Sequence, residues 1–360
     1  MKKLLITLLC LLTLTTSCKQ KSSETTGGES AEVAVAEGAA QKVTPEELEK
    51  KWKSLAIAVK GGGQTPDIVT LLKAFNGVWE TQAVSALLSE ASDPAFTKSN
   101  NPEIGSETAV DRENGSAWLE AGDSDDDCMG AGVWKCDNGH LLLAVNVVTT
   151  QTDHRNVAAH QALCCYDYDP KTEVMKPVEN ALTKLKPQLQ NTVLRYKMPI
   201  AAGVMRIGEE DTTGENETKW HFLEWNGKDF AEYDFCTDTE LEEKVMGVWV
   251  NFDKEEPAIT FNISRDEEEG LTATDCGIYG STEYEVWTMV FDGEIIVREN
   301  LEEDMTDEGE VDTRKPAFDC VFVLNREGNL VGNYYLRQNG GAEFKGNVVL
   351  EHGDPADALK

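Results

Sequence analysis

The chain has 360 residues, of which 65 are Asp or Glu and 33 are Lys or Arg, and its formal net charge is −32. Such acidity argues against a nucleic-acid-binding protein and against a body that lies flat on an anionic membrane, because binding to phosphate depends on Lys and Arg. The same charge is also explained by solubility alone. The length predicts about two domains with sizeable hydrophobic cores.

The start of the chain has the pattern of an export signal. Two lysines precede an apolar run over residues 4–14, and Thr and Ser residues then lead to Cys18. The run is too short for a permanent membrane helix, so it predicts a secretory signal peptide over residues 1–17. No later apolar run approaches the roughly 20 residues that a membrane helix needs.

The cysteine at the end of this signal resembles the lipobox of bacterial lipoproteins, although Leu14 lies four residues before Cys18 rather than the usual three. The resemblance implies that Cys18 is acylated, becomes the first mature residue and holds the protein on a membrane. The alternative is an ordinary cleaved signal with an incidental cysteine. Lys19 replaces the aspartate that retains such lipoproteins in the inner membrane, and no acidic run follows. The resemblance therefore implies a lipid anchor in the outer membrane, with the body facing the periplasm.

Disulfides are the expected use of the remaining cysteines, because an exported chain meets an oxidising compartment. We predict a bridge between Cys276 and Cys320 in the C-terminal domain and a loop stapled by Cys128 and Cys136. A structural zinc site is the alternative, but no CxxC pair occurs.

Cys164 and Cys165 are neighbours on a predicted strand. Their side chains should point to opposite faces, so at most one of them reaches Cys236. Which of the two does so is left open. Seven cysteines follow Cys18, and the odd number predicts one thiol that stays free or pairs between molecules.

The N-terminal part of the mature chain should be a tether followed by a helical segment. Residues 18–42 are rich in Ser, Thr, Glu, Gly and Ala and predict a disordered tether with a reach of about 27 Å. Residues 43–92 predict three helices. The first begins after Thr44 with a capping box and has an apolar stripe as far as Val59, and the others carry stripes over 68–75 and 84–88.

Residues 100–237 change to strand patterns separated by turn dipeptides. They predict an antiparallel β-rich domain whose topology is left open. A short helix is expected over 181–185, and the expected strands cover 117–119, 132–134, 140–148, 162–168, 193–198 and 219–225.

Residues 243–352 show clearer alternation of apolar and polar side chains and predict a small barrel. Tight turns at 292–293, 327–329 and 339–341 separate successive strands. The fold class is therefore mainly β: a small N-terminal helical segment, an antiparallel middle sheet and a C-terminal eight-stranded meander β-barrel. The expected barrel strands cover 248–252, 259–264, 271–276, 284–291, 294–298, 318–324, 330–337 and 343–350.

Gly247-Val248-Trp249 at the start of the first barrel strand resembles the Gly-X-Trp motif of lipocalin and avidin-like barrels, and residues 282–284 resemble a second lipocalin motif. The two lie closer together than in lipocalins, so the resemblance implies a small meander barrel and no particular ligand. Trp249 and Trp287 are candidate ligand-binding residues, because aromatic rings at a barrel mouth stack on flat ligands. Packing in the core is the alternative for both.

Searches for catalytic and metal motifs find no signature in the sequence. HExxH, GxSxG and P-loop patterns do not occur, and His154 and His160 lie in a polar stretch. Asp123, Asp125 and Asp127 form DxDxD, but the glycine and glutamate of a calcium loop do not follow, so a solvated acidic turn is the better interpretation. We expect no catalytic residue, cofactor or metal.

These observations favour a non-catalytic cell-envelope lipoprotein that binds a small ligand or an envelope protein. The alternatives are a secreted hydrolase that uses carboxylates and a structural component of envelope assembly. Two close carboxylates with perturbed pKa values in a deep pocket would favour the hydrolase. A barrel filled by its own side chains would favour the structural component.

Overall fold

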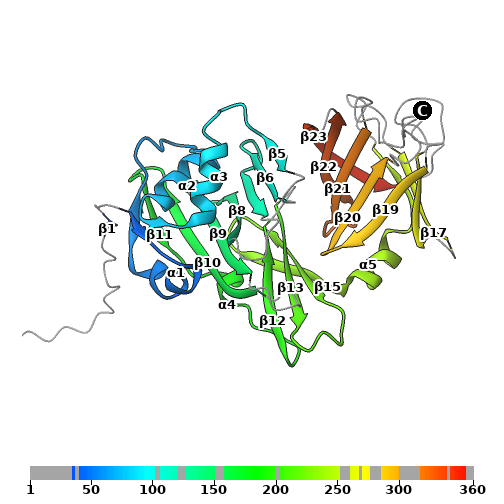
Figure 1. Ribbon diagram of the computed structural model, residues 1–360, viewed down its shortest axis with the longest axis horizontal. Helices are drawn as coiled ribbons and strands as arrows, with labels where there is room; N and C mark the ends of the chain where they lie inside the picture. Colours follow the sequence, from blue (N-terminus) through cyan, green and yellow to red (C-terminus); the bar gives the residue numbers. More distant parts are fainter. Residues whose placement is uncertain are drawn as a thin grey trace, which may run out of the picture. The chain divides into compact units, whose positions relative to one another are not determined.

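A computed structural model describes residues 35–36, 40–101, 106–120, 127–150, 158–198, 203–251, 260–266, 270–275, 285–299, 317–338 and 341–353 (Figure 1). The fold is mainly β, with short helices near the N-terminal end and antiparallel sheets, which confirms the predicted class. None of the described helices is both long and apolar enough to cross a membrane. Cys18, Asp123, Asp125, His154 and Cys276 lie outside the described residues.

A nine-stranded sheet forms the first part of the structure. The four strands that the sequence predicts in this region, 117–119, 132–134, 140–148 and 162–168, are confirmed. The sheet also takes in strands that the sequence patterns did not indicate. In order across the sheet the strands are β1 (Val35–Ala36), β3 (Ala56–Ala58), β11 (Val174–Pro177), β10 (Ala158–Asp169), β9 (Leu141–Thr150), β8 (Asp127–Lys135), β7 (Ser116–Glu120), β6 (Ser106–Asp111) and β5 (Lys98–Asn101).

Short helices cover one face of this sheet (Figure 1): α1 (Pro45–Lys51), the 3₁₀ helix η1 (Trp52–Ser54), α2 (Ile68–Asn76) and α3 (Gln82–Glu90). Thr44 caps α1 through the predicted capping box with Glu47. Asp67 caps α2. Buried Tyr166 on β10 joins the layers, because its hydroxyl donates to Trp52 O and accepts from Trp79 Nε1, each at 2.9 Å.

The prediction of a first helix as far as Val59 was wrong in its second half. Helical structure ends at Ser54, Leu55 is extended, and β3 then pairs in parallel with β1 and antiparallel with β11. The spacing of these apolar residues fits a helix or a strand. Residues 56–58 form a strand because they can pair with β1 and with the edge of β11. The predicted tether is also partly ordered, since β1 and β2 (Gln41–Lys42) pair with β3 and β4 (Trp79–Glu80).

The rest of the predicted middle sheet is a separate four-stranded antiparallel sheet. It is flanked by α4 (Ala181–Lys184) and α5 (Asp238–Val245) and consists of β12 (Thr192–Lys197), β13 (Val204–Asp211), β14 (Lys219–Trp225) and β15 (Phe230–Thr237).

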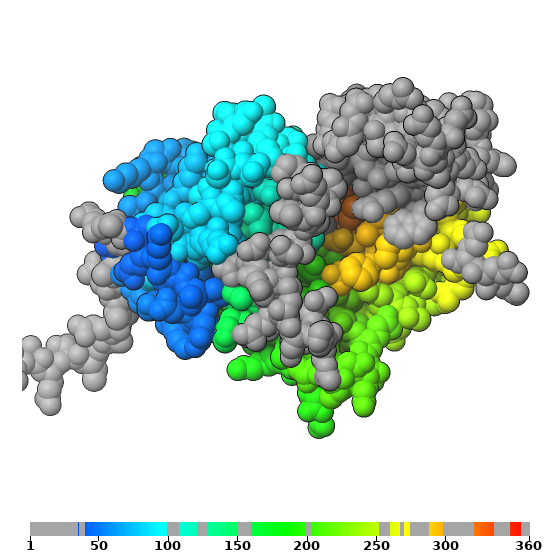
Figure 2. Space-filling view, in the orientation of Figure 1, coloured from blue at the N-terminus to red at the C-terminus, as the bar shows by residue number. Residues whose placement is uncertain are grey.

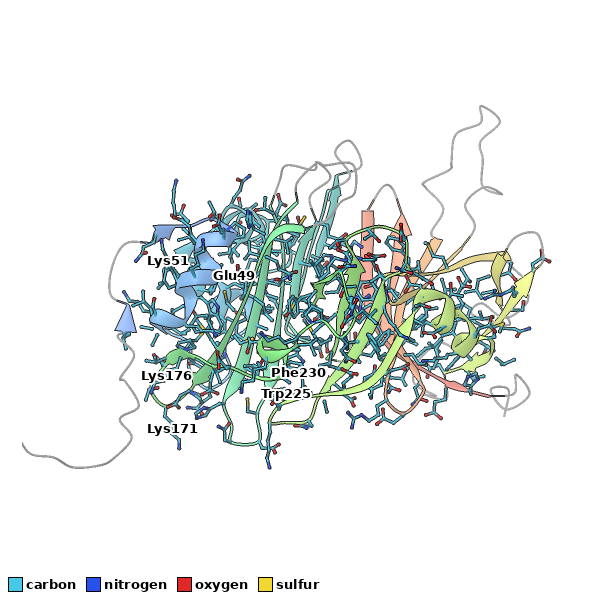
Figure 3. The ribbon with its side chains drawn as sticks, turned by 90° about the horizontal axis from the view of Figure 1, so that it is seen from below. Glu49, Lys51, Lys171, Lys176, Trp225 and Phe230 are labelled. Atoms are coloured by element: carbon cyan, nitrogen blue, oxygen red, sulfur yellow. The ribbon has the colours of Figure 1, made fainter. Side chains whose placement is uncertain are left out.

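Side chains fasten this smaller sheet to the larger one. The Gln161 amide on β10 donates to Leu194 O at 2.9 Å and accepts from Tyr196 N at 3.2 Å, so it pairs with the edge of β12 much as a neighbouring strand does. Trp225, labelled in Figure 3, donates its indole N–H to Lys135 O at 2.7 Å. These contacts satisfy backbone groups that would otherwise lack a strand partner.

The C-terminal part is a closed eight-stranded antiparallel barrel, and all eight predicted strands are present. It is closed by the pairing of the first strand with the last, at Trp249–His352 and Val250–Glu351. Its strands are β16 (Gly247–Val250), β17 (Thr260–Asp266), β18 (Gly270–Asp275), β19 (Glu285–Phe291), β20 (Glu294–Glu299), β21 (Ala317–Leu324), β22 (Leu330–Gln338) and β23 (Gly341–His352).

Large side chains from around the barrel are buried together in one hydrophobic cluster. Its fully buried members, at 1% exposure or less, include Trp249, Phe261, Ile263, Ile295, Val297, Cys320, Phe322, Leu330 and Leu350. An eight-stranded barrel is just wide enough for such side chains to fill it.

The Gly-X-Trp motif has a structural explanation in this barrel. Gly247 has a φ of +124°, and a Cβ there would lie 3.2 Å from the His352 ring. Two residues later, Trp249 is fully buried, its ring centroid lies 3.8 Å from that of His352, and its indole N–H donates to Val245 O at 2.6 Å. Trp249 thus packs where the first and last strands meet.

The predicted loop bridge between Cys128 and Cys136 was wrong. Cys128 lies near the start of β8 and Cys136 directly follows its end, so an extended chain holds them about 26 Å apart. A disulfide needs Cα atoms within about 7 Å. No disulfide is present among the described residues. The bridge from Cys276 to Cys320 stays a prediction, because only Cys320 is described.

Candidate functional site

The four-stranded sheet places charged side chains on both of its faces, because successive residues of a strand point to opposite sides. On β13, Arg206 and Glu210 point to one face and Glu209 to the other. The first face shares a hydrophobic cluster with the barrel through Trp220 and Phe222. Each face carries a cluster of ionic groups.

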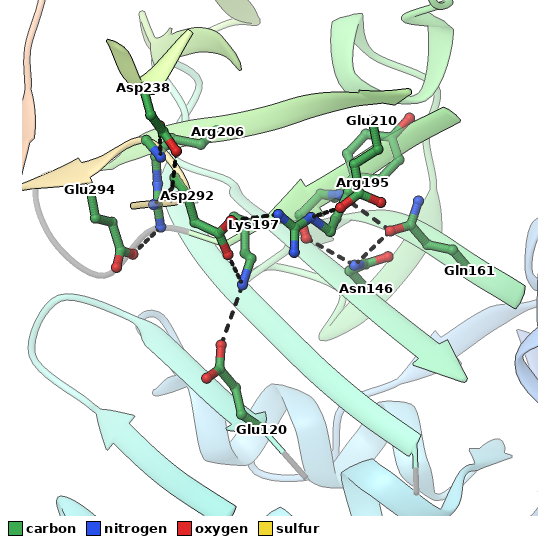
Figure 4. Close-up of polar contacts among 12 residues, drawn as sticks. Glu120, Asn146, Gln161, Arg195, Lys197, Arg206, Glu210, Asp238, Asp292 and Glu294 are labelled. Atoms are coloured by element: carbon green, nitrogen blue, oxygen red, sulfur yellow. Dashed lines mark hydrogen bonds and ion pairs between the residues drawn. The ribbon is translucent and has the colours of Figure 1, made fainter. Parts of the chain in front are cut away.

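The cluster on the barrel side centres on Asp292, in the turn between β19 and β20 (Figure 4). The Asp292 carboxylate contacts Arg195 Nη2 at 2.5 Å and Lys197 Nζ at 3.0 Å. Arg195 Nε also lies 2.8 Å from Glu210, and Arg206, which is 1% exposed, pairs with Glu294. We call these six residues and Asp238, which binds the turn, the Asp292 cluster.

The turn itself is held by its backbone. Asp292 and Gly293 both have positive φ, at 56° and 70°, the Asp-Gly pattern of a tight hairpin turn. Their N–H groups donate to the Asp238 carboxylate at 3.0 and 2.8 Å, and Arg206 Nη1 donates to Asp292 O at 2.6 Å. A Cβ on Gly293 would lie 3.2 Å from the Trp220 ring. The turn therefore seats tightly on the smaller sheet.

The pKa shifts in this cluster follow from burial and neighbouring cations. Burial disfavours the ionised form of Asp292, but Lys197 and Arg195 outweigh it and hold its pKa below the usual value. Burial dominates for Glu210 and Glu294 and raises the pKa of each, although cations lie beside them. Raised carboxyl pKa values often mark acid–base catalysts, but buried ion-pair networks produce them as well. Here every carboxylate contacts a cation or backbone donor of the same interface, which supports a structural role.

The second cluster lies on the other face and centres on His221, which is fully buried. Its Nε2 lies 2.9 Å from Glu209 and its Nδ1 lies 3.0 Å from Glu232, so one side chain joins β13, β14 and β15. Glu209 also accepts from the N–H groups of Gln188 and Leu189.

These contacts determine the protonation state of the cluster. Burial opposes ionisation of Glu209, but the backbone donors and His221 outweigh it and lower its pKa. An ionised Glu209 only accepts, so Nε2 of His221 carries a proton.

We expect Glu209→Gln to lower the free energy of unfolding at pH 7 by about 2–3 kcal/mol, because a buried charge-assisted network loses its anion. The folded pKa of Glu209 lies below the ordinary value of 4.5. Its contribution is therefore complete above pH 4.5 and disappears as the pH falls through the folded value. Urea unfolding of both proteins should show their difference shrinking in acid.

Glu232→Gln is the matched control, since it contacts the other nitrogen of the same ring but its side chain is 36% exposed. Its effect should be smaller than that of Glu209→Gln. An equal effect of the two substitutions, or a difference between wild type and Glu209→Gln that does not change with pH, would contradict this assignment.

A surface pocket lies away from both clusters. It has a volume of about 210 Å³ and lies where the loop after α3 meets the β6–β7 hairpin. It is lined by Pro94, Phe96, Thr97, Ala109, Val110, Asp111, Arg112, Glu113 and Trp118. This segment, cyan in Figure 2, reaches the molecular surface.

Of the two predicted ligand-binding residues, only Trp249 has a described side chain. Trp249 lies in the barrel core, which favours packing over ligand stacking. Trp287 lies on β19, and its side chain is outside the described part. The Asp292 cluster was missed. Two features of the sequence belong to this cluster: the cations Arg195 and Lys197, which alternate on one strand, and the tight Asp-Gly turn. Because almost a hundred residues separate them, no local pattern indicates that they lie together in the fold.

Among the described residues, no group of three or more His, Cys, Asp or Glu side chains is placed to hold a metal ion. Comparisons with protein-family models, with curated proteins and with solved structures find no match to this chain. The arguments below therefore depend on its own residues.

Proposed function

We propose that the chain is a lipoprotein of the cell envelope, held in the outer membrane by an acylated Cys18, whose folded part acts by binding a partner rather than by catalysis. The signal-like residues 1–17 and Cys18 support the anchor. Several acyl chains, at about 0.8 kcal/mol for each buried methylene, would make that anchor stable. The absence of aspartate at position 19 supports the outer membrane, facing the periplasm.

The observation that carries the non-catalytic part of the proposal is that interior charged groups are used to hold the fold together. Arg206 pairs with Glu294, Asp292 with Arg195 and Lys197, and His221 with two glutamates. A catalytic acid or base must reach a substrate. The alternative of a carboxylate-dependent hydrolase would draw on Glu210 and Glu294, but these face cations in the interface.

The buried cluster inside the barrel bears on how a partner is bound. Because buried side chains pack together in the described part of the barrel interior, we place binding on the outer surface of the protein rather than inside the barrel. The same observation favours the second candidate, a structural component of the envelope. The two candidates differ in whether a partner is captured reversibly.

Cys18→Ser should move the protein from the membrane fraction of cells to the soluble envelope fraction, because serine cannot form the thioether that carries the lipid. Cys10→Ser, a change within the same leader, should leave the protein with the membrane. Fractionation followed by immunoblotting measures both. Continued sedimentation of Cys18→Ser with membranes would count against the anchor.

A pull-down tests binding. The chain from Lys19 onward, immobilised and exposed to envelope extract, should retain a protein that a salt wash releases. If it instead hydrolyses an envelope glycan or peptide, the non-catalytic proposal fails.

A further inference from the structure

We propose that the surface around β3 and β11 faces the membrane in the anchored protein and lies against anionic phospholipid headgroups. We call it the β3–β11 surface, and it comprises residues 56–63 and 169–177. This inference rests on the proposed lipid anchor at Cys18 and adds which side of the folded body the membrane meets. The observations that carry it are the place where the chain enters the body and the uneven distribution of charge.

The chain enters the folded body beside this surface. β1 is the first described segment, and its Ala36 pairs with Ile57 of β3. On the other side of β3, Ile57 pairs with Met175 of β11. Val35 follows Cys18 by only 17 positions, which span at most about 60 Å when fully extended. An acylated Cys18 therefore holds the β3–β11 surface within that distance of the membrane.

Three exposed lysines, Lys60, Lys171 and Lys176, lie on the β3–β11 surface, and none has an ion pair with another described residue. Val59 N, just before the first of them, donates to Glu173 O at 2.8 Å. This bond holds the turn at 60–63 against the turn between β10 and β11. Figure 3 shows Lys171 and Lys176 on the same side of the molecule. The fold thus gathers these cations in one region.

Carboxylates in this region keep it close to neutral. Glu173 accepts from Gly63 N at 2.9 Å, Asp169 accepts from Lys171 N at 2.8 Å, and Glu49 on α1 is exposed. The lysines of α1 and η1 each pair with a carboxylate: Lys50 with Glu46, Lys51 with Glu47 and Lys53 with Glu179. An anionic leaflet therefore neither attracts nor repels this surface strongly.

The rest of the chain is strongly acidic, and this difference determines the orientation. Residues 18–98 and 159–190, which include the β3–β11 surface, hold 13 Lys or Arg against 15 Asp or Glu. Residues 99–158 and 191–360 hold 18 against 50. An anionic leaflet repels carboxylates within about a Debye length, roughly 8 Å at physiological ionic strength. Turning the smaller sheet or the barrel toward the lipid would bring this excess of carboxylates to the headgroups.

The test uses the whole lipidated chain, purified from membranes and reconstituted in vesicles that contain phosphatidylglycerol. A trace phospholipid whose headgroup carries a photoreactive diazirine labels residues near the bilayer, and mass spectrometry of peptides locates the labels. The labelling of each peptide is divided by its labelling in detergent micelles. Residues 18–43 are left out, because the anchor itself brings them near the lipid.

We expect peptides from the β3–β11 surface to carry at least about threefold more label than peptides from the barrel. This preference should shrink toward equality in vesicles of phosphatidylcholine alone and at high salt, because both remove the electrostatic difference. Lys171→Glu combined with Lys176→Glu should reduce it as well, since the surface then becomes acidic.

Arg265→Glu combined with Arg326→Glu is the matched control, because it makes the same change in formal charge at two exposed cations of the barrel. It should keep the preference. The proposal is overturned if barrel peptides are labelled as strongly as the β3–β11 surface, if phosphatidylcholine and salt leave the preference unchanged, or if both double variants reduce it equally. A chain that does not float with the vesicles would contradict the anchor itself, whereas evenly spread labels on a floating chain remove only the orientation.

Discussion

Trp249→Ala is expected to lower the free energy of unfolding by about 3–5 kcal/mol, the usual cost of removing a large buried aromatic side chain. Trp249 is fully buried at the junction of β16 and β23, packs against the His352 ring and donates to Val245 O. Its removal leaves a cavity at the only ladder that closes the described barrel. Chemical denaturation followed by circular dichroism measures the loss.

Two further variants make this result specific. Trp249→Phe keeps the ring but loses the hydrogen bond to Val245 O, so it should cost less than alanine. Phe291→Ala removes an aromatic side chain of the same barrel that is 54% exposed, and it should change stability by about 0.5 kcal/mol or less. If Trp249 instead formed a ligand site, alanine would be tolerated. A loss below about 1 kcal/mol would therefore contradict the core assignment.

Asp292→Asn is expected to cost about 2–3 kcal/mol, because it leaves Arg195 and Lys197 without their shared anion in a partly buried interface. The side chain of Asp292 is 12% exposed and those of its two partners are 26% exposed, which places the expected cost below that of a fully buried pair. Asparagine has nearly the same shape and tolerates the positive φ of 56°. The change therefore removes charge without breaking the turn.

A second substitution separates the charge effect from a turn defect. Adding Lys197→Met to Asp292→Asn removes one stranded cation, so the double variant should lose less stability than the sum of the single losses. Glu215→Gln, a change at an exposed carboxylate, should stay within about 0.5 kcal/mol of wild type. Strict additivity would mean that Asp292 does not act through Lys197.

The sequence predicted what depends on local pattern. All eight barrel strands were expected, because each follows an alternation of apolar and polar side chains, and a tight turn such as Asp292-Gly293 marks where one strand ends and the next begins. The capping box at Thr44 was found for the same reason. The resemblance to Gly-X-Trp barrels also placed Gly247 and Trp249 at the opening of the first strand, where the structure gives each a packing role.

Features of the fold that depend on contacts between residues far apart in the chain could not be predicted from local sequence patterns. Residues 56–58 continue an apolar helical stripe, yet β11, more than a hundred residues later, offers them a sheet edge. Cys128 and Cys136 looked like a loop staple because the strand between them was expected to be shorter than β8 is. The Asp292 cluster joins residues 195 and 292, which no short motif connects.

The measurement that tests this account most directly is the mass of the mature N-terminal peptide, purified from the membrane fraction of cells that express the whole chain. The account predicts a peptide that begins at Cys18 and carries the mass of attached acyl chains. A mature chain that begins elsewhere, or an unmodified Cys18 thiol, would contradict the lipid anchor and with it the proposed place of this protein in the envelope.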